Sequence, residues 1–318
     1  MTSLAPQPDR RSVLRGLALG AAALGTVALG TAACGTDDTP TVRLAAGEPG
    51  GFFWDFSGLL AAAARRAGTA RLEPLPTGGS AENLQLLGAG SAALAMTLGD
   101  IAQDRVATDG FAAVGRVYEN YFQVAVRADS PITAPARLAG RTVSVGAPGS
   151  GASTLSARVL DVVGLGAPTA VRRVERTMHG AAAALATGEV DAAMWAGGLP
   201  TPAFADPATP IRLLDLGGEV DALRQRFGSV YESVTVPAGV YGANPAMTTV
   251  GVANLLLARR DVADRVAADM VDLLLDDPSA LVPAQAVGSQ FLDAQSLIQT
   301  GPVALHPGAA AEYRRRHG

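Results

Sequence analysis

A glycine-rich turn that leads into a helical pattern is the part of this sequence best suited to hold a small molecule. The segment Thr77–Ser80 contains Gly78 and Gly79, and Ser80 can cap the helix that continues past Asn83. Glycines let the backbone approach a bound group closely, and free N–H groups in the first turn of a helix attract anions. We therefore expect this stretch to contact a small solute and not to catalyse a reaction.

The turn and the helix behind it recur later in the chain. Residues 87–99 align with residues 185–197, with glycines and methionines at matching places, and both stretches end in residues typical of turns. Residues 41–50 and 142–149 also resemble each other, because each has an apolar run that ends in a Pro-Gly turn before a helical pattern. The repeat predicts two similar α/β lobes that face each other.

The apolar runs predict a sheet whose strands are mainly parallel. Residues 92–97 show no polar alternation, as in parallel strands that helices cover on both faces, and residues 190–195 are expected to form the matching strand of the second lobe. Residues 111–117 are expected to form a further strand. Two more runs, 121–126 and 249–258, are each followed by a charged turn and are expected to carry the chain from one lobe to the other and back.

The predicted fold class is therefore α/β with two lobes and two strands that cross between them. We assign residues 41–125 with 250–318 to lobe I and residues 126–249 to lobe II. Two crossings of this kind are what a hinge between lobes needs.

The other candidate ligand-binding residues follow predicted strands or open predicted helices. In open α/β sheets, ligands bind beyond the carboxyl ends of the strands. Besides Thr77–Ser80 and Asn83, the candidates are Gly50, Gly51, Phe53, Asp100, Gly149, Ser150, Gly151, Trp195, Gly198, Thr201 and Tyr241.

Several of these residues have a second interpretation. Phe53 belongs to the run Phe52–Trp54, which forms either a pocket wall or a hydrophobic staple in the core. Asp100 either faces the crevice or caps a helix, and Trp195 packs either on a ligand or in the core. His179 begins a predicted helix and is interpreted as a capping or surface residue.

The chemistry of many enzyme sites is missing from the sequence. All 25 residues counted as lysine or arginine are arginines, which excludes a phosphate-loop lysine, a Schiff-base lysine and a Ser-x-x-Lys nucleophile. The 3 histidines show no metal-ligand spacing, and Ser150 lacks the flanking glycines of a nucleophile elbow. Gly149 and Gly151 resemble a dinucleotide loop only in part, because the third glycine is absent. We predict no catalytic residue, no metal, no cofactor and no enzymatic activity.

The composition fits a folded domain that does not bind nucleic acid. Of the 318 residues, 48% are apolar and 17% are charged, which is enough to build two lobes with a real core. The net charge of −4, without a basic cluster away from the termini, argues against nucleic acid as the main partner.

The first 33 residues have the features of an export signal. A twin-arginine pair precedes a small, apolar run that leads directly to Cys34, the only cysteine. Residues 1–33 resemble a bacterial lipoprotein signal peptide, with Cys34 as the lipidated residue and 34–40 as a tether, although Thr31 stands where a leucine is usual. The alternative is a membrane-spanning helix, for which this Gly- and Ala-rich run is only weakly hydrophobic. We expect an exported protein, lipid-anchored on the outer face of the cytoplasmic membrane.

Once these segments are taken together, the chain resembles the TAXI-type solute receptors of TRAP transporters over roughly residues 41–313. The motifs that carry the resemblance are TGGSAENL at 77–84, VAVRADS at 124–130, VGAPGSG at 145–151, AAMWAGGLPT at 192–201, VPAGVY at 236–241 and HPGA at 306–309. Two segments depart from the family pattern: Phe52–Trp54 replaces a Tyr-Tyr-Pro-like segment, and Ala152–Ser153 stands where Thr-Glu is more usual.

The resemblance implies a type II periplasmic-binding-protein fold that closes on a ligand about two hinge strands. It also implies delivery of the ligand to a membrane TRAP permease, which is driven by an ion gradient and needs no ATP. The ligands that it implies are small carboxylates and amino acids such as glutamate.

Three alternatives stay open at this point. The chain can be the receptor of an ABC importer built from the same lobes, or a ligand-sensing module that signals to a membrane partner. An exported enzyme on a two-lobed scaffold is the third, and the missing nucleophile, metal and cofactor patterns count against it.

Overall fold

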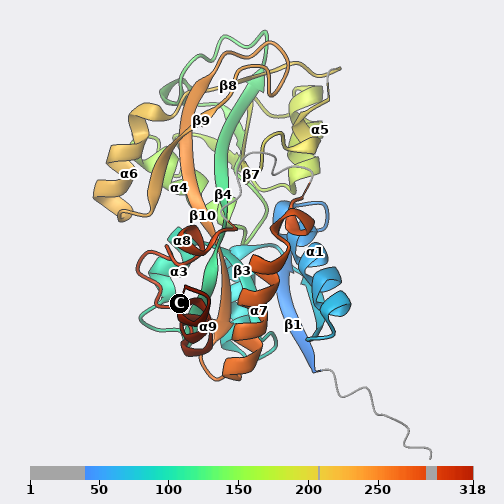
Figure 1. Ribbon diagram of the computed structural model, residues 1–318. Helices are drawn as coiled ribbons and strands as arrows, with labels where there is room; N and C mark the ends of the chain where they lie inside the picture. The colour runs from blue at the N-terminus through green and yellow to red at the C-terminus, as the bar shows by residue number, and fades with distance from the viewer. Residues whose placement is uncertain (1–39, 207, 284–291, 318) are drawn as a thin grey trace, which may run out of the picture. The chain divides into compact units, whose positions relative to one another are not determined.

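The structure, a computed structural model, describes residues 40–206, 208–283 and 292–317 (Figure 1). The predicted signal peptide 1–33, the lipidation site Cys34 and all of the tether except Pro40 lie outside the described residues. Among the helices of the described residues, none combines the length and the apolar character needed to cross a membrane.

The first part of the described chain alternates strands and helices. Its elements are β1 (Thr41–Gly47), α1 (Phe52–Ala67), β2 (Arg71–Pro76), α2 (Ser80–Gly88), β3 (Leu94–Leu98) and α3 (Gly99–Arg105). β1 lies between β2 and β3 and is parallel to both. α1 ends at Gly68 because this residue adopts a left-handed conformation, with φ of 66°, that glycine tolerates best.

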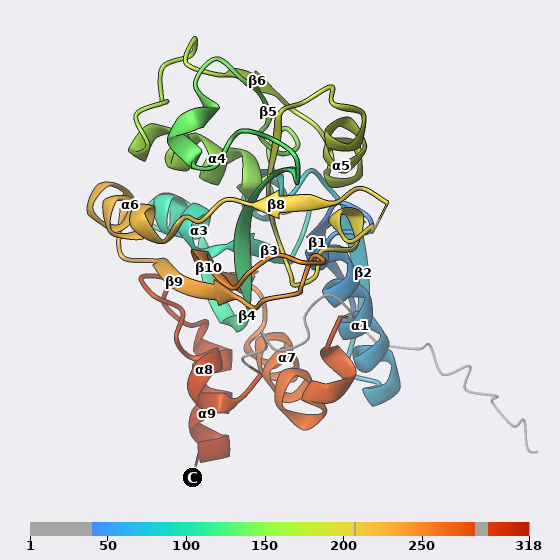
Figure 2. The ribbon, with the colours of Figure 1, turned by 90° about the horizontal axis from the view of Figure 1, so that it is seen from above.

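The same order of elements and the same strand pairing return in the second part. Its elements are β5 (Thr142–Ser144), α4 (Gly151–Val162), β6 (Arg172–Val174), α5 (Met178–Thr187) and β7 (Ala192–Gly197). β5 lies between β6 and β7 and is parallel to both. In Figures 1 and 2, α4 and α5 lie on either side of these strands. The structure thus shows the repeat that the sequence predicts.

Two long antiparallel strands, β4 (Phe111–Arg127) and β10 (Met247–Arg259), join the two parts (Figure 1). The second half of β10 pairs with β3, and its first half pairs with β9 (Tyr231–Val236). The second half of β4 pairs with β7 and with β8 (Ile211–Leu213). The strand order β2-β1-β3-β10-β4-β7-β5-β6 therefore places one repeat on each side of the crossing strands.

The prediction of two separate strands over 111–117 and 121–126 is wrong, because β4 is continuous. Tyr118, Glu119 and Asn120 stand opposite Asn254, Ala253 and Val252 of β10, so the polar residues that suggested a break belong to the strand ladder. We call the part with β1–β3 and α1–α3 lobe I. The part with β5–β9, α4, α5 and α6 (Val220–Phe227) is lobe II. The residue boundaries assigned to the lobes stay a prediction.

The remaining helices cover the lobes. They are α6 (Val220–Phe227), α7 (Asp264–Asp276), α8 (Ala294–Leu297) and α9 (Pro307–His317), with short 3₁₀ helices at Pro135–Leu138, Pro202–Phe204, Gly217–Glu219 and Pro278–Leu281. α7 and α9 pack beside lobe I (Figure 1).

An aromatic cluster ties the start of α1 to the crossing strand β4. The ring centroids of Phe52 and Phe56 lie 4.6 and 5.1 Å from that of Tyr118, in edge-to-face contacts. All three side chains are buried. The core interpretation of the run Phe52–Trp54 therefore describes Phe52 well, and this packing fixes the start of α1 against β4.

Candidate ligand-binding site

A cavity of about 90 Å³ lies where the carboxyl ends of β1, β3, β5 and β7 approach one another. Eight predicted ligand-binding residues line it: Gly51, Phe53, Gly78, Gly79, Ser80, Ser150, Gly151 and Trp195. The cavity is smaller than the roughly 300–1,000 Å³ of sites for drug-sized ligands, so it suits a small solute.

Glycines let the two lobes touch around this cavity. A Cβ atom built on Gly78 would lie 2.7 Å from the carbonyl oxygen of Pro148, and one built on Gly79 would lie 3.2 Å from Cα of Ser150. The N–H of Ala81 donates a hydrogen bond of 3.1 Å to the carbonyl of Gly149. The backbone of Gly78–Ala81 in lobe I therefore contacts the backbone of Pro148–Ser150 in lobe II, and the two lobes are in a closed arrangement.

The N–H groups at the start of α2 are not the free anion donors that the sequence predicts. The N–H of Gly78 donates to Glu82 Oε2 at 2.6 Å, and that of Gly79 donates to Thr77 Oγ1 at 3.2 Å. The N–H of Ala81 donates to the carbonyl of Gly149 in lobe II. These three donors are already satisfied within the protein.

The prediction that Ser80 caps α2 is also wrong. The helix begins at Ser80 itself, and its N-cap is Gly79, which has a φ of 121° and no capping side chain. The Ser80 hydroxyl instead accepts a hydrogen bond of 3.1 Å from the N–H of Leu98, which ties α2 to the end of β3.

In lobe II the corresponding serine is a true cap. Ser150 Oγ accepts a hydrogen bond of 3.0 Å from the N–H of Ser153 and donates one of 2.7 Å to the carbonyl of Ala147. α4 then begins at Gly151, and both Gly151 and Ala152 line the cavity. The positive end of the α4 dipole thus lies beside the cavity.

The other eight predicted residues do not line the cavity. They are Gly50, Thr77, Asn83, Asp100, Gly149, Gly198, Thr201 and Tyr241. The hydroxyl of Thr77 donates to Asn83 Oδ1, and Asn83 Nδ2 donates to the carbonyl of Met96 at 2.7 Å. These two hydrogen bonds connect the glycine turn to α2 and α2 to β3. Gly50 lies close to His179, since a Cβ at this glycine would be 3.2 Å from the His179 ring.

Gly198, Thr201 and Tyr241 hold Trp195. The indole N–H of Trp195 donates to Thr201 Oγ1 at 3.0 Å, and Thr201 Oγ1 donates to the carbonyl of Gly198 at 2.7 Å. The N–H of Thr201 donates in turn to the hydroxyl of Tyr241 at 2.8 Å. The indole also stacks on Phe204, with ring centroids 3.7 Å apart. Trp195 is therefore a rigid wall of the cavity, held by residues that do not line it.

Three polar residues that the sequence analysis missed also line the cavity: Glu48, Asn120 and Arg176. Burial raises the pKa of Glu48, whereas the backbone N–H of Met178 and the charge of His179 favour its ionised form. Arg176 forms an ion pair with Glu189.

Asn120 is 5% exposed and lies in the middle of β4. A polar residue inside a strand that is buried along most of its length is the signal that could have identified it.

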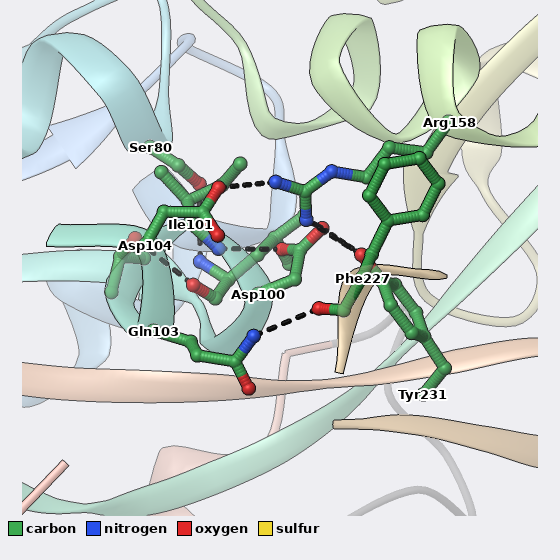
Figure 3. A network of polar contacts seen from close by, with 10 residues as sticks. Ser80, Asp100, Ile101, Gln103, Asp104, Arg158, Phe227 and Tyr231 are labelled. Atoms are coloured by element: carbon green, nitrogen blue, oxygen red, sulfur yellow. Dashed lines mark hydrogen bonds and ion pairs between the residues drawn. The ribbon is translucent and has the colours of Figure 1, made fainter. Parts of the chain in front are cut away.

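Asp100 belongs to a separate polar network that bridges the lobes (Figure 3). Arg158 of α4 lies 3.1 Å from Asp100 Oδ2 and also pairs with Asp104, both on α3. Its Nη1 donates to the hydroxyl of Tyr231 at 2.6 Å, and that hydroxyl donates to Asp100 Oδ2 at 3.2 Å. The guanidinium lies 5.2 Å from the ring centroid of Phe227. We call these contacts the Arg158 network.

Burial raises the pKa of Asp100 to about 6, although Arg158, the N–H of Ile101 and Tyr231 favour the ionised form. The folded protein therefore binds more protons at Asp100 than the unfolded chain between pH 3.8, its ordinary pKa, and about 6. The stability that this group contributes is present below this range and is lost as the pH rises through it.

We expect Asp100→Asn, which cannot titrate, to gain stability relative to the unsubstituted protein as the pH rises from about 4 to about 6, and to keep that advantage constant above this range. Free energies of unfolding in urea, measured for both proteins at several pH values, test this. Stability curves that stay parallel from pH 4 to 7 would contradict the assignment of a raised pKa to Asp100.

Within the ranges that the structure describes, no group of three or more His, Cys, Asp or Glu residues is placed to hold a metal ion. The cavity itself offers apolar walls, one carboxylate, one amide and one guanidinium. Such a lining can bind and orient a solute by contact and hydrogen bonding.

Comparison with known proteins gives a family and a fold. Residues 44–315 match the model of the NMT1-like family. A protein of Bordetella bronchiseptica RB50 has a similar structure, with a TM-score of 0.57 at 15% identity over 88% of this chain and 99% of that one. A binding protein component of an ABC phosphonate transporter from Pseudomonas aeruginosa gives 0.49 at 13% identity over 87% and 94%. The periplasmic aliphatic sulphonate binding protein of Escherichia coli gives 0.41 at 19% identity over 87% and 83%.

The duplicated sets of parallel strands, the two crossing strands and the cavity between the lobes define a type II periplasmic-binding-protein fold, and the predicted fold class is confirmed. The chain belongs to the NMT1-like family, whose model covers residues 44–315. The narrower assignment to the TAXI receptors stays a prediction.

Proposed function

We propose that this protein is the extracytoplasmic solute-binding protein of a membrane importer, and that it binds a small solute between its lobes without transforming it. One observation carries the proposal: the glycine turns of both repeats and Trp195 line a single cavity, beside which Gly78 and Gly79 contact lobe II. Hinged closure of two lobes around a ligand is the established behaviour of periplasmic binding proteins.

The solute class that we propose is a small organic anion or an amino acid such as glutamate. The size of the cavity favours a small solute, and the start of α4 and Arg176 beside it favour a negatively charged group on that solute. Apolar contact with Phe53 and Trp195 would hold the rest of the molecule.

For the membrane partner we propose an ABC importer in place of a TRAP permease. The TRAP assignment depends on the TAXI resemblance, whereas the family that the chain matches is the NMT1-like family. The adjacent genes distinguish the two classes, because an ABC system requires an ATPase subunit and a TRAP system does not. We retain the export signal and lipid attachment at Cys34 as part of the proposal, which places the protein on the outer face of the cytoplasmic membrane.

Substitutions in the cavity wall test the proposed site. We expect Ser80→Ala and Ser150→Ala each to weaken solute binding, because each serine positions a turn that lines the cavity. Trp195→Ala should weaken it more, since it removes a large aromatic side chain from the cavity wall. Isothermal titration calorimetry with the solute that co-purifies with the domain measures these effects. Unchanged affinity in all three variants would place the binding site elsewhere.

A further inference from the structure

Arginines gather at the edge of the lobe I sheet that lies opposite the cavity. β1, β2 and β3 are parallel and the cavity lies at the carboxyl ends of β1 and β3, so the amino ends of these strands form the opposite edge. α1 and the antiparallel strand β10 end at this edge, which is the lower end of lobe I in Figure 1. Six arginines in or next to these elements form what we call the basic edge: Arg43, Arg65, Arg66, Arg71, Arg259 and Arg260.

These arginines are far apart in the sequence and meet only in the folded sheet. Nη1 of Arg43 donates a hydrogen bond of 3.3 Å to the carbonyl of Ser91. The guanidinium of Arg259 lies beside Gly90, since a Cβ built on this glycine would be 2.5 Å from Nη1 of Arg259. Arg43 and Arg259 therefore flank the same turn between α2 and β3. Arg71 begins β2, the neighbour of β1 on the other side.

The positive charge of the basic edge is only partly neutralised. Among the described residues, Arg259 is the one member with a carboxylate at ion-pair distance, that of Asp261. Glu73 stands opposite Arg43 in the strand register, and the tether contributes the two aspartates at 37–38. Opposite charges at the same edge cancel in two further pairs: Arg105 with Asp109, and Asp264 with its neighbour Arg265. The six arginines thus outnumber the four carboxylates near them, although the whole chain has a net charge of −4.

The proposed lipid anchor reaches the domain at this same edge. Pro40, which precedes β1, lies six residues after Cys34, and a fully extended chain of this length spans only about 20–22 Å. A lipid on Cys34 would therefore keep the start of β1 and the basic edge within this distance of the membrane surface. Arginines close to an anionic membrane are attracted to it, over a range of about 8 Å at physiological ionic strength.

We propose that the basic edge docks lobe I on the anionic phospholipid headgroups of the membrane that holds the anchor. This surface goes beyond the proposed function, but it rests on the lipid attachment at Cys34 that forms part of it. Guanidinium groups suit this partner because they stay charged and can donate two hydrogen bonds to one phosphate. The cavity lies at the opposite edge of the sheet, so docking leaves it free to take up a solute.

The exported domain without its lipid shows what the arginines contribute alone. Residues Thr39–Gly318 form one compact unit, so the chain from Gly35 onward is suitable. Co-sedimentation compares vesicles of phosphatidylglycerol with vesicles of phosphatidylcholine. We expect a partition coefficient about tenfold or more higher for the anionic vesicles, and a steep fall as salt is raised. Inorganic phosphate should displace the domain no more than chloride does at equal ionic strength.

Two variants with the same change in charge test whether the basic edge is responsible. The first replaces four of its members together: Arg43→Gln, Arg65→Gln, Arg66→Gln and Arg71→Gln. The control changes the corresponding edge of lobe II, where Arg172 pairs with Thr142 as Arg71 pairs with Thr41: Arg127→Gln, Arg137→Gln, Arg141→Gln and Arg172→Gln. We expect the first variant to lose about tenfold or more in partition coefficient on anionic vesicles, and the control to stay within about threefold.

Three results would overturn the proposed docking surface: equal binding to both kinds of vesicle, binding that does not fall with salt, and equal losses in the two variants. Stronger displacement by phosphate than by chloride would also overturn it, because it would indicate a site for free phosphate. Thermal unfolding shows whether each variant is folded. The solute content of the domain purified from its own host tests the proposed function independently, since none of the substituted arginines lines the cavity.

Discussion

Replacing Arg158 by alanine is expected to lower the affinity for the solute about 100-fold, although Arg158 does not line the cavity. Arg158 comes from lobe II, and its partners Asp100 and Asp104 come from lobe I, so the Arg158 network forms only when the lobes are closed. Asp100 has no exposed surface in this arrangement. Removing the cation leaves a buried carboxylate unpaired, which costs about 3–5 kcal/mol.

Two controls separate this effect from a general loss of stability. Arg226→Ala removes another lobe II arginine, which pairs with Asp161 at 2.8 Å and is 59% exposed, and we expect little change because exposed ion pairs contribute about 0–1 kcal/mol. The double variant Arg158→Ala with Asp100→Asn should bind better than Arg158→Ala alone, because no charge remains buried without a partner. Calorimetric affinities for the four proteins test this. An affinity in Arg158→Ala equal to that in Arg226→Ala would show that the network does not favour closure.

Adding a single methyl group at Gly78 is expected to lower the affinity about 10- to 100-fold while leaving the ligand-free protein nearly as stable as before. Gly78 is not among the glycines with positive φ, so its backbone accepts alanine. The new Cβ would lie 2.7 Å from the carbonyl oxygen of Pro148, a backbone atom of the other lobe that cannot rotate away. The substitution therefore obstructs closure and not folding.

Gly88→Ala is the matched control for this prediction. Gly88 lies at the other end of α2, and a Cβ there would meet no heavy atom within 4 Å. We expect an unchanged affinity and a stability gain of about 0.5–1 kcal/mol, because alanine favours the helix over glycine. Calorimetry and thermal unfolding of both variants provide the measurement. A Gly78→Ala protein that binds as tightly as Gly88→Ala would mean that the lobes need not meet at this turn.

The sequence predicts the fold well because hydrophobic periodicity and turn residues are local signals. The repeat of strand, turn and helix beginning at Thr41 and again at Thr142 appears as β1–α1 and β5–α4. The sequence predicts two strands in place of β4 because the polar residues at 118–120 interrupt its apolar pattern. The backbone of these residues pairs with β10, whose position opposite them is a long-range feature that local patterns do not contain.

The side-chain roles within the site were harder to predict. Ser80 and Asp100 have the residue types and positions of helix caps, but Ser80 Oγ binds the N–H of Leu98 and Asp100 pairs with Arg158. Ser80 thus has a tertiary partner in place of a local one, whereas Asp100 keeps a local hydrogen bond from the N–H of Ile101 beside its tertiary partner. Local patterns do not reveal Asn120 either, since its position in the cavity depends on where the two crossing strands meet the turns of both lobes.

The cavity between the lobes is proposed to hold a small solute and to leave it unchanged. Native mass spectrometry of the exported domain, purified from its own host without unfolding, measures both properties at once. We expect one small solute per chain in the original protein, released chemically intact, and its loss in the Trp195→Ala variant. A solute retained equally by Trp195→Ala, a solute released in altered form, or a domain free of any small molecule would contradict it.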